Sequence, residues 1–311
     1  MALHRLVGME IAVPDPNELA AFYDEIGFTQ GGERAWGAPE QPDQIQIVEG
    51  PYRTLRRVTV ACESEEDLAD TGIRLDGMGI KYQNGGGRLS VVDPINEWEF
   101  VIEPAEVKDI TEQPKRLLNR PGERTRIGAR AEVIVEDRPR PPRRLGHVVV
   151  GTPKPIETTR FITEGLGFRI SDQIGGGLAT FTRCSPDHHN LLVAPGHVPY
   201  LNHYALEHDD FDAVMRAATV YLRTHGNERQ IAGPGRHQIG GNTFWYLRDP
   251  AGNFFEYFAD MDYIVDDDAW EIGTDWNPTD SWSVWGEKDQ PEVFFSPVDT
   301  QSIIDGWNKA H

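Results

Sequence analysis

The sequence predicts an α+β fold in which four βαβββ modules pair into two domains. The first observation is a repeat: "LVGMEIAVPDPNELAAFYDEIGF" (6–28) and "RLGHVVVGTPKPIETTRFITEGLGF" (144–168) both read as an apolar strand, a proline-containing turn, a helix, and Gly-Phe before another strand. The second is that "VVDPINEWEFVIEP" (91–104) and "LRDPAGNFFEYFAD" (247–260) share an Asp-Pro turn followed by an aromatic-rich strand. The two halves of the chain are therefore expected to share one architecture.

A third observation is that the second half itself divides into two units, each with a strand, a helix and three further strands. The first unit has a strand at 145–150, a helix near 155–165 and strands near 168–174, 178–183 and 190–194. The second has a strand at 203–207, a helix at about 209–224 and strands near 230–232, 243–248 and 254–258. Because one helix cannot cover both faces of such a sheet, we expect two units to pair their sheets into a curved trough that can hold a ligand.

The domain boundaries follow from composition. The segment "EDRPRPPRR" (136–144) is too rich in proline for a helix or a central strand and reads as a linker between an N-terminal domain, 1–135, and a C-terminal domain, 145–262. Because large aromatic rings are costly to expose to water, we expect the tail, 263–311, to cover the trough mouth or a subunit contact. Five of the eight tryptophans lie in this tail: Trp270, Trp276, Trp282, Trp285 and Trp307.

The charge of the chain limits its partners. The 311 residues include 50 acidic and 30 basic side chains, and the net charge of −20 repels nucleic-acid phosphates and anionic lipid, which leaves a small molecule as the expected partner. The sequence has no stretch of ~18 apolar residues and no apolar signal region at its start. Cys62 and Cys184 fall in different halves and cannot form a disulfide framework. We therefore expect a cytoplasmic protein with reduced thiols.

The histidines point to the second half as the site of any chemistry. Eight of the ten lie between 147 and 237, and the first half holds only His4. His147 opens the first strand of the third module, His203 opens the first strand of the fourth, and Glu256 lies in the last strand of the fourth. Two imidazoles and one carboxylate on one face of a sheet suit non-haem Fe(II), with Mn(II) as an alternative. Each residue also has an ordinary structural explanation, as a core histidine, a surface histidine or an edge-strand glutamate.

The repeat provides an internal control for these three residues. The aligned positions of the first half hold apolar side chains: Met9 opposite His147, Phe100 opposite Glu256 and, in a looser match, Val60 opposite His203. A purely structural role for the polar residues is disfavoured, because the first half is expected to pack without them. The sequence therefore predicts one metal site, in the second half only.

At these residues the chain resembles a known family. The segment "GPGRHQIGGNTFWYLRDPAGNFFEYF" (233–258) looks like the signature of the type I extradiol catechol dioxygenases of the vicinal oxygen chelate superfamily, of the two-domain kind that includes 2,3-dihydroxybiphenyl 1,2-dioxygenase and catechol 2,3-dioxygenase. The resemblance covers roughly residues 4 to 290. It implies a glyoxalase-like fold and Fe(II) held by His147, His203 and Glu256 with O2 as co-substrate. A homo-oligomer is expected only because it is the common case for soluble proteins. The expected reaction opens a catechol ring to a 2-hydroxymuconic semialdehyde-type product in aromatic hydrocarbon catabolism.

The resemblance also assigns the catalytic residues. His189 in "SPDHHNLLV" matches the acid–base histidine of the family, although a shift of one position would give that role to His188. A histidine with a pKa near 6.5 can hold and release a proton near neutrality. Tyr246 and His237 match a tyrosine and a histidine of the family. Tyr246 is expected to donate a hydrogen bond to the deprotonated substrate oxygen, and His237 to steady the chelate or the oxygen.

The same segment bears on the substrate. Relatives that cleave carboxylate-bearing catechols place an arginine shortly before "GPGRH", where this sequence has Ala232. Burying an unpaired carboxylate costs several kcal/mol, so we expect a neutral catechol with an alkyl or aryl substituent. Arg229 and Arg236 lie close by and supply the cation if the strand is shifted.

Two other functions fit the same fold. One is a metal-dependent glyoxalase-like isomerase or thiol transferase, and the other is a non-enzymatic small-molecule binding protein. The isomerases and thiol-adding enzymes are usually single short domains with a site shared between two half-chains, whereas here one half lacks the three polar residues. A binding protein would lack them in both halves.

Overall fold

The computed structural model describes residues 2–108, 117–131, 141–279 and 281–311 of the chain. It confirms the predicted α+β fold with four βαβββ modules, each made of one long strand, a helix and three further strands. Most of the predicted linker 136–144 lies outside the described residues. The predicted domain boundaries stay a prediction.

The first two modules form one eight-stranded sheet in the order β2-β3-β4-β1-β5-β8-β7-β6. The long strands β1 and β5 pair antiparallel at its centre, and each pairs in parallel with the last strand of its own module. The elements are β1 (Leu3–Val13), α1 (Pro16–Glu25), β2 (Thr29–Gly32), β3 (Ala35–Ala38), β4 (Gln41–Glu49), β5 (Thr54–Cys62), α2 (Glu65–Gly77), β6 (Tyr82–Gly85), β7 (Arg88–Val92) and β8 (Glu99–Pro104).

The last two modules form the central eight strands of a ten-stranded sheet in the order β19-β12-β13-β14-β11-β15-β18-β17-β16-β20. A π-helical turn, Phe161–Leu166, continues α3, and together they fill the predicted helix near 155–165. The elements are β11 (Arg144–Thr152), α3 (Pro155–Arg160), β12 (Arg169–Ile174), β13 (Ala179–Arg183), β14 (Leu191–Pro195), β15 (Tyr200–Glu207), α4 (Phe211–His225), β16 (Gln230–His237), β17 (Thr243–Arg248) and β18 (Phe254–Ala259).

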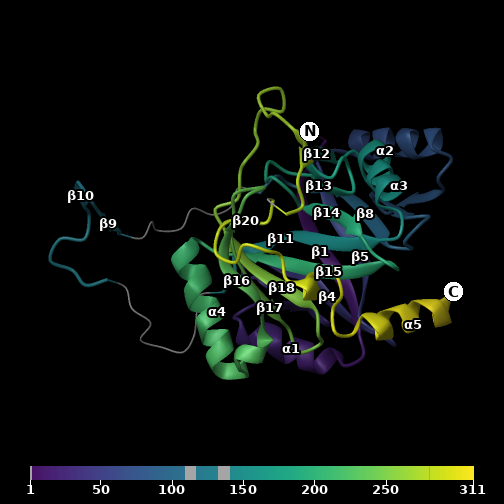
Figure 1. Cartoon of the computed structure of the whole chain (residues 1–311). Helices are drawn as coiled ribbons and strands as arrows, with labels where there is room; N and C mark the ends of the chain where they lie inside the picture. The colour runs from purple at the N-terminus through teal and green to yellow at the C-terminus, as the bar shows by residue number, and fades with distance from the viewer. Residues whose placement is uncertain (1, 109–116, 132–140, 280) are drawn as a thin grey trace.

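The tail adds both edge strands of this second sheet. β19 (Gly273–Trp276) pairs with β12, and β20 (Ser283–Trp285) pairs with β16. The short 3-10 turn Glu292–Phe294 and helix α5 (Thr300–Ala310) follow, and α5 ends the chain at the side of the molecule (Figure 1). The tail is therefore part of the second sheet rather than an appended segment.

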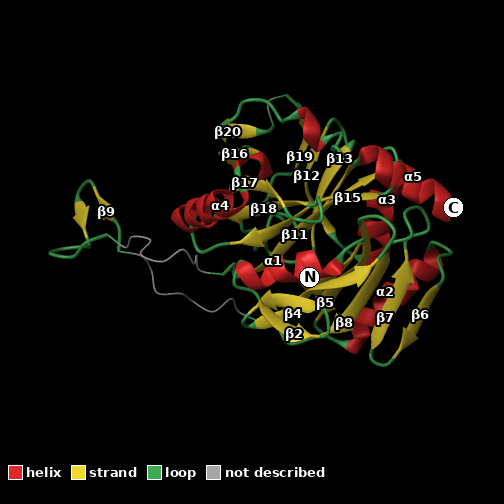
Figure 2. Ribbon diagram, turned by 90° about the horizontal axis from the view of Figure 1, so that it is seen from below, coloured by secondary structure: helices red, strands yellow, loops and turns green. Residues whose placement is uncertain are grey.

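One hydrophobic core runs through both halves. Helix α1 of the first half packs on the second, where the ring of Phe22 lies 5.1 Å from that of Phe255 and 5.7 Å from that of Tyr221. Arg74 in α2 donates hydrogen bonds to the carbonyl oxygens of Gly165 and Leu166. Figure 2 shows the two sheets one above the other, with α1 where they meet. The two halves thus pack directly against each other.

A basic arm stands apart from both sheets. The described segment 117–131 forms the small hairpin of β9 (Asn119–Arg120) and β10 (Glu123–Arg124), which lies away from the rest of the chain in both views (Figures 1 and 2). Its side chains are almost all exposed. Over the described residues, no helix combines the length and apolar character needed to cross a bilayer.

The register of the repeat corrects the alignment made from the sequence. β1 ends at Val13 and β11 ends at Thr152, and each closes the parallel pairing with the last strand of its module. Gly8 lies five residues before Val13, and His147 lies five residues before Thr152. Gly8, not Met9, is therefore the counterpart of His147. The alignment placed the glycine of "GME" opposite the glycine of "GHV", whereas the strand pairing shifts the match by one residue.

The strand pairing also identifies the other two counterparts. They are Arg57 for His203 and Val101 for Glu256, in place of Val60 and Phe100. None of Gly8, Arg57 and Val101 offers a ligand atom to a divalent metal.

The prediction that apolar side chains fill the first trough is therefore wrong. Arg57 lies in that trough and pairs with Glu10 at 3.0 Å and with Glu99 at 2.6 Å. The cavity there, about 630 Å³, has mostly polar and charged walls. In the first half, the ion-paired Arg57 therefore takes the position that corresponds to His203, and the trough is polar rather than apolar.

Candidate metal centre

Three neighbouring strands at the middle of the second sheet bring the predicted ligands to one face. His147 on β11 pairs with Ala205 on β15, and Ala205 pairs in turn with Glu256 on β18. Residues directly opposite each other in a sheet point to the same side. His203 lies two residues before Ala205 and therefore shares that face. Because Ala205 is small, the longer side chains on either side of it can meet.

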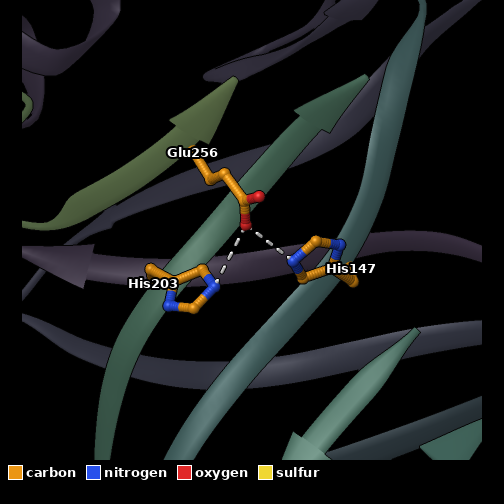
Figure 3. Close-up of side chains that lie close together, drawn as sticks. All are labelled: His147, His203 and Glu256. Atoms are coloured by element: carbon orange, nitrogen blue, oxygen red, sulfur yellow. Dashed lines mark hydrogen bonds and ion pairs between the residues drawn. The ribbon is translucent and has the colours of Figure 1, made fainter. Parts of the chain in front are cut away.

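The three side chains converge on a common point (Figure 3). His147 Nε2 lies 3.0 Å from Glu256 Oε2, and His203 Nε2 lies 3.5 Å from the same oxygen. One ligand atom from each residue lies within 4.8 Å of the other two, and this is the one such group of three among the described residues. The exposed fractions are 1% for His147, 6% for His203 and 0% for Glu256, so the group is shielded from water.

The neighbouring amide fixes the tautomer of His203. Asn202 Nδ2 donates to the carbonyl oxygen of Phe294 at 2.8 Å, which leaves Asn202 Oδ1 to accept from His203 Nδ1 at 2.8 Å. The proton therefore sits on Nδ1, and His203 Nε2 is a buried atom with no hydrogen bond to any described residue. Burial, the largest cause, lowers the pKa of His203 to about 4. At neutral pH the ring thus presents a free lone pair.

Glu256 is held as a carboxylate. Burial alone would raise its pKa, but the neighbouring imidazoles of His147 and His203 outweigh burial and lower that pKa below its usual range. Its second oxygen, Oε1, accepts from Asn242 Nδ2 at 2.9 Å. Two imidazoles and an ionised carboxylate on one face, with an unpartnered nitrogen among them, fit the donor set of a divalent transition metal.

His189 enters the same cavity from the loop before β14. Its ring centroid lies 4.3 Å from that of His147. Burial first, and then the neighbouring histidines, lowers the pKa of His189 well below its usual value. His188 is fully buried, and its Nε2 lies 2.7 Å from Asp172 Oδ2, while its Nδ1 lies 3.1 Å from His189 Nδ1. Of the two adjacent histidines, His189 is the one that lines the cavity.

Tyr246 and His237 lie on the other side of the carboxylate. Tyr246 on β17 pairs directly with Glu256. His237 Nδ1 donates to the carbonyl oxygen of Trp282 at 2.8 Å, so its Nε2 accepts from the Tyr246 hydroxyl, also at 2.8 Å. Burial, with the nearby Glu256 charge, raises the pKa of Tyr246 well above its usual value. The phenol is therefore protonated and can donate a hydrogen bond.

The cavity over these residues has a volume of about 230 Å³ and apolar walls. The second sheet and its loops provide much of the wall: Val149, Ile174, Leu178, Phe181, Leu192 and Ile239. The tail adds Trp282 and Phe294 to this wall. Of the five tail tryptophans, Trp282 lines the cavity and Trp285 is 42% exposed, so a cover over the whole trough mouth stays a prediction.

The cationic residues near "GPGRH" face elsewhere. Ala232 is fully buried on β16. Arg229 donates to the carbonyl oxygen of Asp249 at 3.0 Å, and Arg236 donates to the Asp260 carboxylate at 2.8 Å. Among the described residues, the cavity wall contains no lysine and no arginine.

The sequence analysis did not identify several residues of the site. Ala205 and Asn242 are recognised only once the strand pairing and the hydrogen bonds are known. Asn202 had one available signal, its position directly before His203. The carbonyl groups of Trp282 and Phe294 carry no sequence signal at all, because any residue supplies the same group.

Comparisons with known proteins place the chain among relatives. Residues 144–257 match the family model described as Glyoxalase/Bleomycin resistance protein/Dioxygenase superfamily. Metapyrocatechase 2 of Cupriavidus necator is 30% identical over 304 residues, which cover 94% of this chain and 92% of that protein. The manganese-dependent 2,3-dihydroxybiphenyl 1,2-dioxygenase of Geobacillus genomosp. 3 is 32% identical over 138 residues, 42% of this chain and 43% of that protein.

Solved structures share the fold. The Mn(II)-bound glyoxalase from Novosphingobium aromaticivorans superimposes with a TM-score of 0.72 at 23% identity and covers 95% of both chains. Homoprotocatechuate 2,3-dioxygenase from Arthrobacter globiformis superimposes with a TM-score of 0.72 at 19% identity, covering 94% of this chain and 91% of that one. At these identities the likeness establishes the fold.

Proposed function

The chain belongs to the extradiol dioxygenases of the Glyoxalase/Bleomycin resistance protein/Dioxygenase superfamily, and from this premise we propose that it opens the ring of a neutral catechol at a metal held by His147, His203 and Glu256. The observation that carries the proposal is the convergence of these three side chains at the floor of an apolar cavity. The product is a 2-hydroxymuconic semialdehyde-type compound, with O2 as co-substrate.

The metal we propose is Fe(II). When bound, it supplies chelation of the two catechol oxygens and activation of dioxygen, and two histidines with one carboxylate are the ligand set of many non-haem Fe(II) oxygenases. Mn(II) is the alternative, because the same donors accept it and the Geobacillus relative is manganese-dependent. Metal analysis of protein purified from cells supplied with both metals distinguishes the two.

The remaining site residues handle protons and orientation. We assign the acid–base role to His189, which faces the cavity beside His147 and is kept neutral by burial. A neutral imidazole can take the proton of a catechol hydroxyl and return it later in the reaction. Tyr246 is protonated, and we assign its hydroxyl to turn from His237 Nε2 and donate its hydrogen bond to a substrate oxygen instead.

The substrate we propose bears an alkyl or aryl substituent and no charge. Ile174, Leu178 and Leu192 offer that substituent an apolar wall, and no described cation lines the cavity. A ring-attached carboxylate would lose its hydration without gaining a partner, which costs several kcal/mol. Neutral catechols are therefore expected to be preferred over acidic ones.

A metal-dependent isomerase is the second candidate, because the Novosphingobium glyoxalase covers nearly all of the chain. The deciding experiment loads the metal-free protein with ferrous iron, adds 3-methylcatechol without air and then admits oxygen. The proposal expects yellow ring-opened product and consumption of O2, and Glu256→Gln should give neither. Absence of product with every catechol tested, together with turnover of a hemithioacetal, would establish the isomerase instead.

We further propose that the protein is a cytoplasmic homo-oligomer, in which the arm 117–131 contacts a second copy. The arm carries four arginines and one glutamate, a charge of +3, on a chain whose net charge is −20. Its exposed apolar side chains, Leu117, Leu118 and Ile127, are available for burial. Molar mass from light scattering checks this: replacing 117–131 with a Gly-Ser linker should lower the mass, and an unchanged mass contradicts the contact.

A further inference from the structure

The C-terminal tail reaches the candidate metal centre through two backbone carbonyl groups. The carbonyl oxygen of Phe294 accepts from Asn202 Nδ2 at 2.8 Å, and that of Trp282 accepts from His237 Nδ1 at 2.8 Å. The rings of the same two tail residues form part of the cavity wall. One segment therefore contacts both the supports of the centre and the space for the substrate.

The side-chain amide of Asn202 links Phe294 in the tail to His203 in the candidate metal centre. A carbonyl oxygen can only accept, so the NH2 group of Asn202 must face Phe294, and its oxygen must face His203 Nδ1. Turning the amide over would break the hydrogen bond to Phe294 and would leave His203 Nδ1 bonded only if the imidazole proton moved to Nε2. The contact with the tail thus determines which nitrogen of His203 keeps the proton and how the ring is oriented.

An ion pair fastens the tail at the same strand. Arg53, 3% exposed, comes from the first half and pairs with Asp299 directly before α5, with Nη2 to Oδ1 at 2.9 Å. Arg53 Nη1 also donates to the carbonyl oxygen of Leu201, the residue before Asn202, at 3.0 Å. The tail, the first half and strand β15 therefore meet within two residues of His203.

We propose that Asn202 is a positioning residue that couples the tail to His203, so that the fit of the substrate substituent against Trp282 and Phe294 and the orientation of His203 depend on the same hydrogen bonds. This inference rests on the proposed function, because it takes His203 as a metal ligand. It goes beyond that function by making the tail a working part of the centre.

The first test measures metal affinity, without turnover. Metal-free protein is titrated with Co(II) under nitrogen, and binding is followed by the visible absorption of the metal. Asn202→Leu loses both hydrogen bonds and should bind Co(II) roughly 10- to 100-fold more weakly, the usual effect of removing a hydrogen-bond partner from a metal-ligating histidine. Asn202→Asp keeps the acceptor for His203 and loses the donor to Phe294, so it should retain most of the affinity.

The second test separates the tail from the ligand. Asn202→Asp and Asp299→Asn both loosen the tail and leave His203 its acceptor, so each should raise KM for 2,3-dihydroxybiphenyl with a smaller change in kcat. Matched controls are Asn308→Leu and Asn308→Asp, because Asn308 lies exposed in α5. Circular dichroism verifies that every variant is folded.

Two results would overturn the inference. Tight Co(II) binding by Asn202→Leu overturns the positioning role, and an unchanged KM in both Asn202→Asp and Asp299→Asn overturns the coupling to the tail. In either case the proposed function survives if the wild type binds Co(II) and cleaves catechols. A wild-type protein that binds no metal overturns both.

Discussion

His147 Nε2 and Glu256 Oε2 meet at 3.0 Å although 109 positions separate the two residues in the chain. They stand in one row of the sheet with Ala205 between them. Their contact therefore depends on the small size of the residue over which both side chains reach.

Replacing Ala205 with leucine should disrupt the centre. The larger side chain occupies the space in which the imidazole and the carboxylate meet, and overpacking a buried site typically costs 1–3 kcal/mol of stability. We expect weakened Co(II) binding in titrations, and urea unfolding measures the stability cost. Ala205→Ser, which is nearly the same size, is the control. A leucine variant with wild-type affinity would show that the row does not determine the contact.

Glu256→Gln should abolish tight metal binding. The amide keeps the shape of the side chain but removes the negative charge that the metal requires. Metal analysis of the reconstituted wild type is expected to give one equivalent per chain, and the variant close to none. Glu99→Gln, a change of the same kind in the trough of the first half, should keep that equivalent. Two equivalents per wild-type chain, both needed for activity, contradict the single site.

His189→Phe should leave metal and catechol binding largely intact and lower kcat by a factor on the order of 10²–10⁴, the scale for loss of a positioned acid–base group. Stopped-flow absorbance after mixing with oxygen measures it. His188→Phe is the comparison, because His188 does not line the cavity. It also removes the 3.1 Å contact with His189 Nδ1, so a smaller loss of kcat is expected in this variant. If the loss occurs in the His188 variant alone, the two roles must be exchanged.

The metal-free protein should lose stability as the pH falls from about 6.5 toward 4. His203 is neutral in the folded state because burial lowers its pKa to about 4, whereas the unfolded chain takes up the proton near pH 6.5. The unfolded state therefore binds more protons in this window, and the free energy of unfolding decreases on acidification. Urea unfolding of wild type and His203→Gln at pH 7, 6, 5 and 4 isolates this residue.

The advantage of the wild type over His203→Gln should shrink across that window by on the order of 3 kcal/mol. Comparing the two proteins cancels the groups that titrate identically in both. A difference that stays constant with pH would mean that His203 is not held neutral in the folded protein.

Placing a cation in the cavity should change the substrate preference. Leu178 lines the cavity and is 51% exposed, so Leu178→Arg is expected to fold. The wild type should have a higher kcat/KM for 3-methylcatechol and 2,3-dihydroxybiphenyl than for homoprotocatechuate. The arginine variant should shift the ratio toward the acid, and Leu178→Gln should not. Preference of the wild type for the acid would mean that a cation reaches the substrate in solution.

Much of the fold could be predicted because the modules have strong local signals. The helix predicted at about 209–224 is α4 (Phe211–His225), and the strand predicted at 243–248 is β17 (Thr243–Arg248). Asp210 caps α4 by accepting a hydrogen bond from the backbone of Ala213. Signals of this kind lie within a few residues of each other, so the sequence alone carries them.

The register of the repeat could not be predicted in the same way. A one-residue shift between Met9 and Gly8 leaves the apolar pattern nearly unchanged, and only the hydrogen bonds between strands distinguish the two alignments. The contacts of Trp282 and Phe294 with the site could not be predicted either, because their backbone carbonyl groups accept the hydrogen bonds. Both the register and these contacts depend on residues far apart in the sequence.

Gly8 has a consequence for protein engineering. A Cβ atom at this position would lie 2.5 Å from the carbonyl oxygen of Gln44, so no histidine fits there without moving the strand. Gln44 Oε1 accepts a hydrogen bond from the backbone of Leu145 at 3.0 Å, two residues before His147. Placing a histidine at position 8, to copy the three ligands into the first half, would therefore displace Gln44 and disturb the strand that carries His147. The first half thus supports strand β11 through Gln44, and a variant with a metal in each half would need another contact to replace this support.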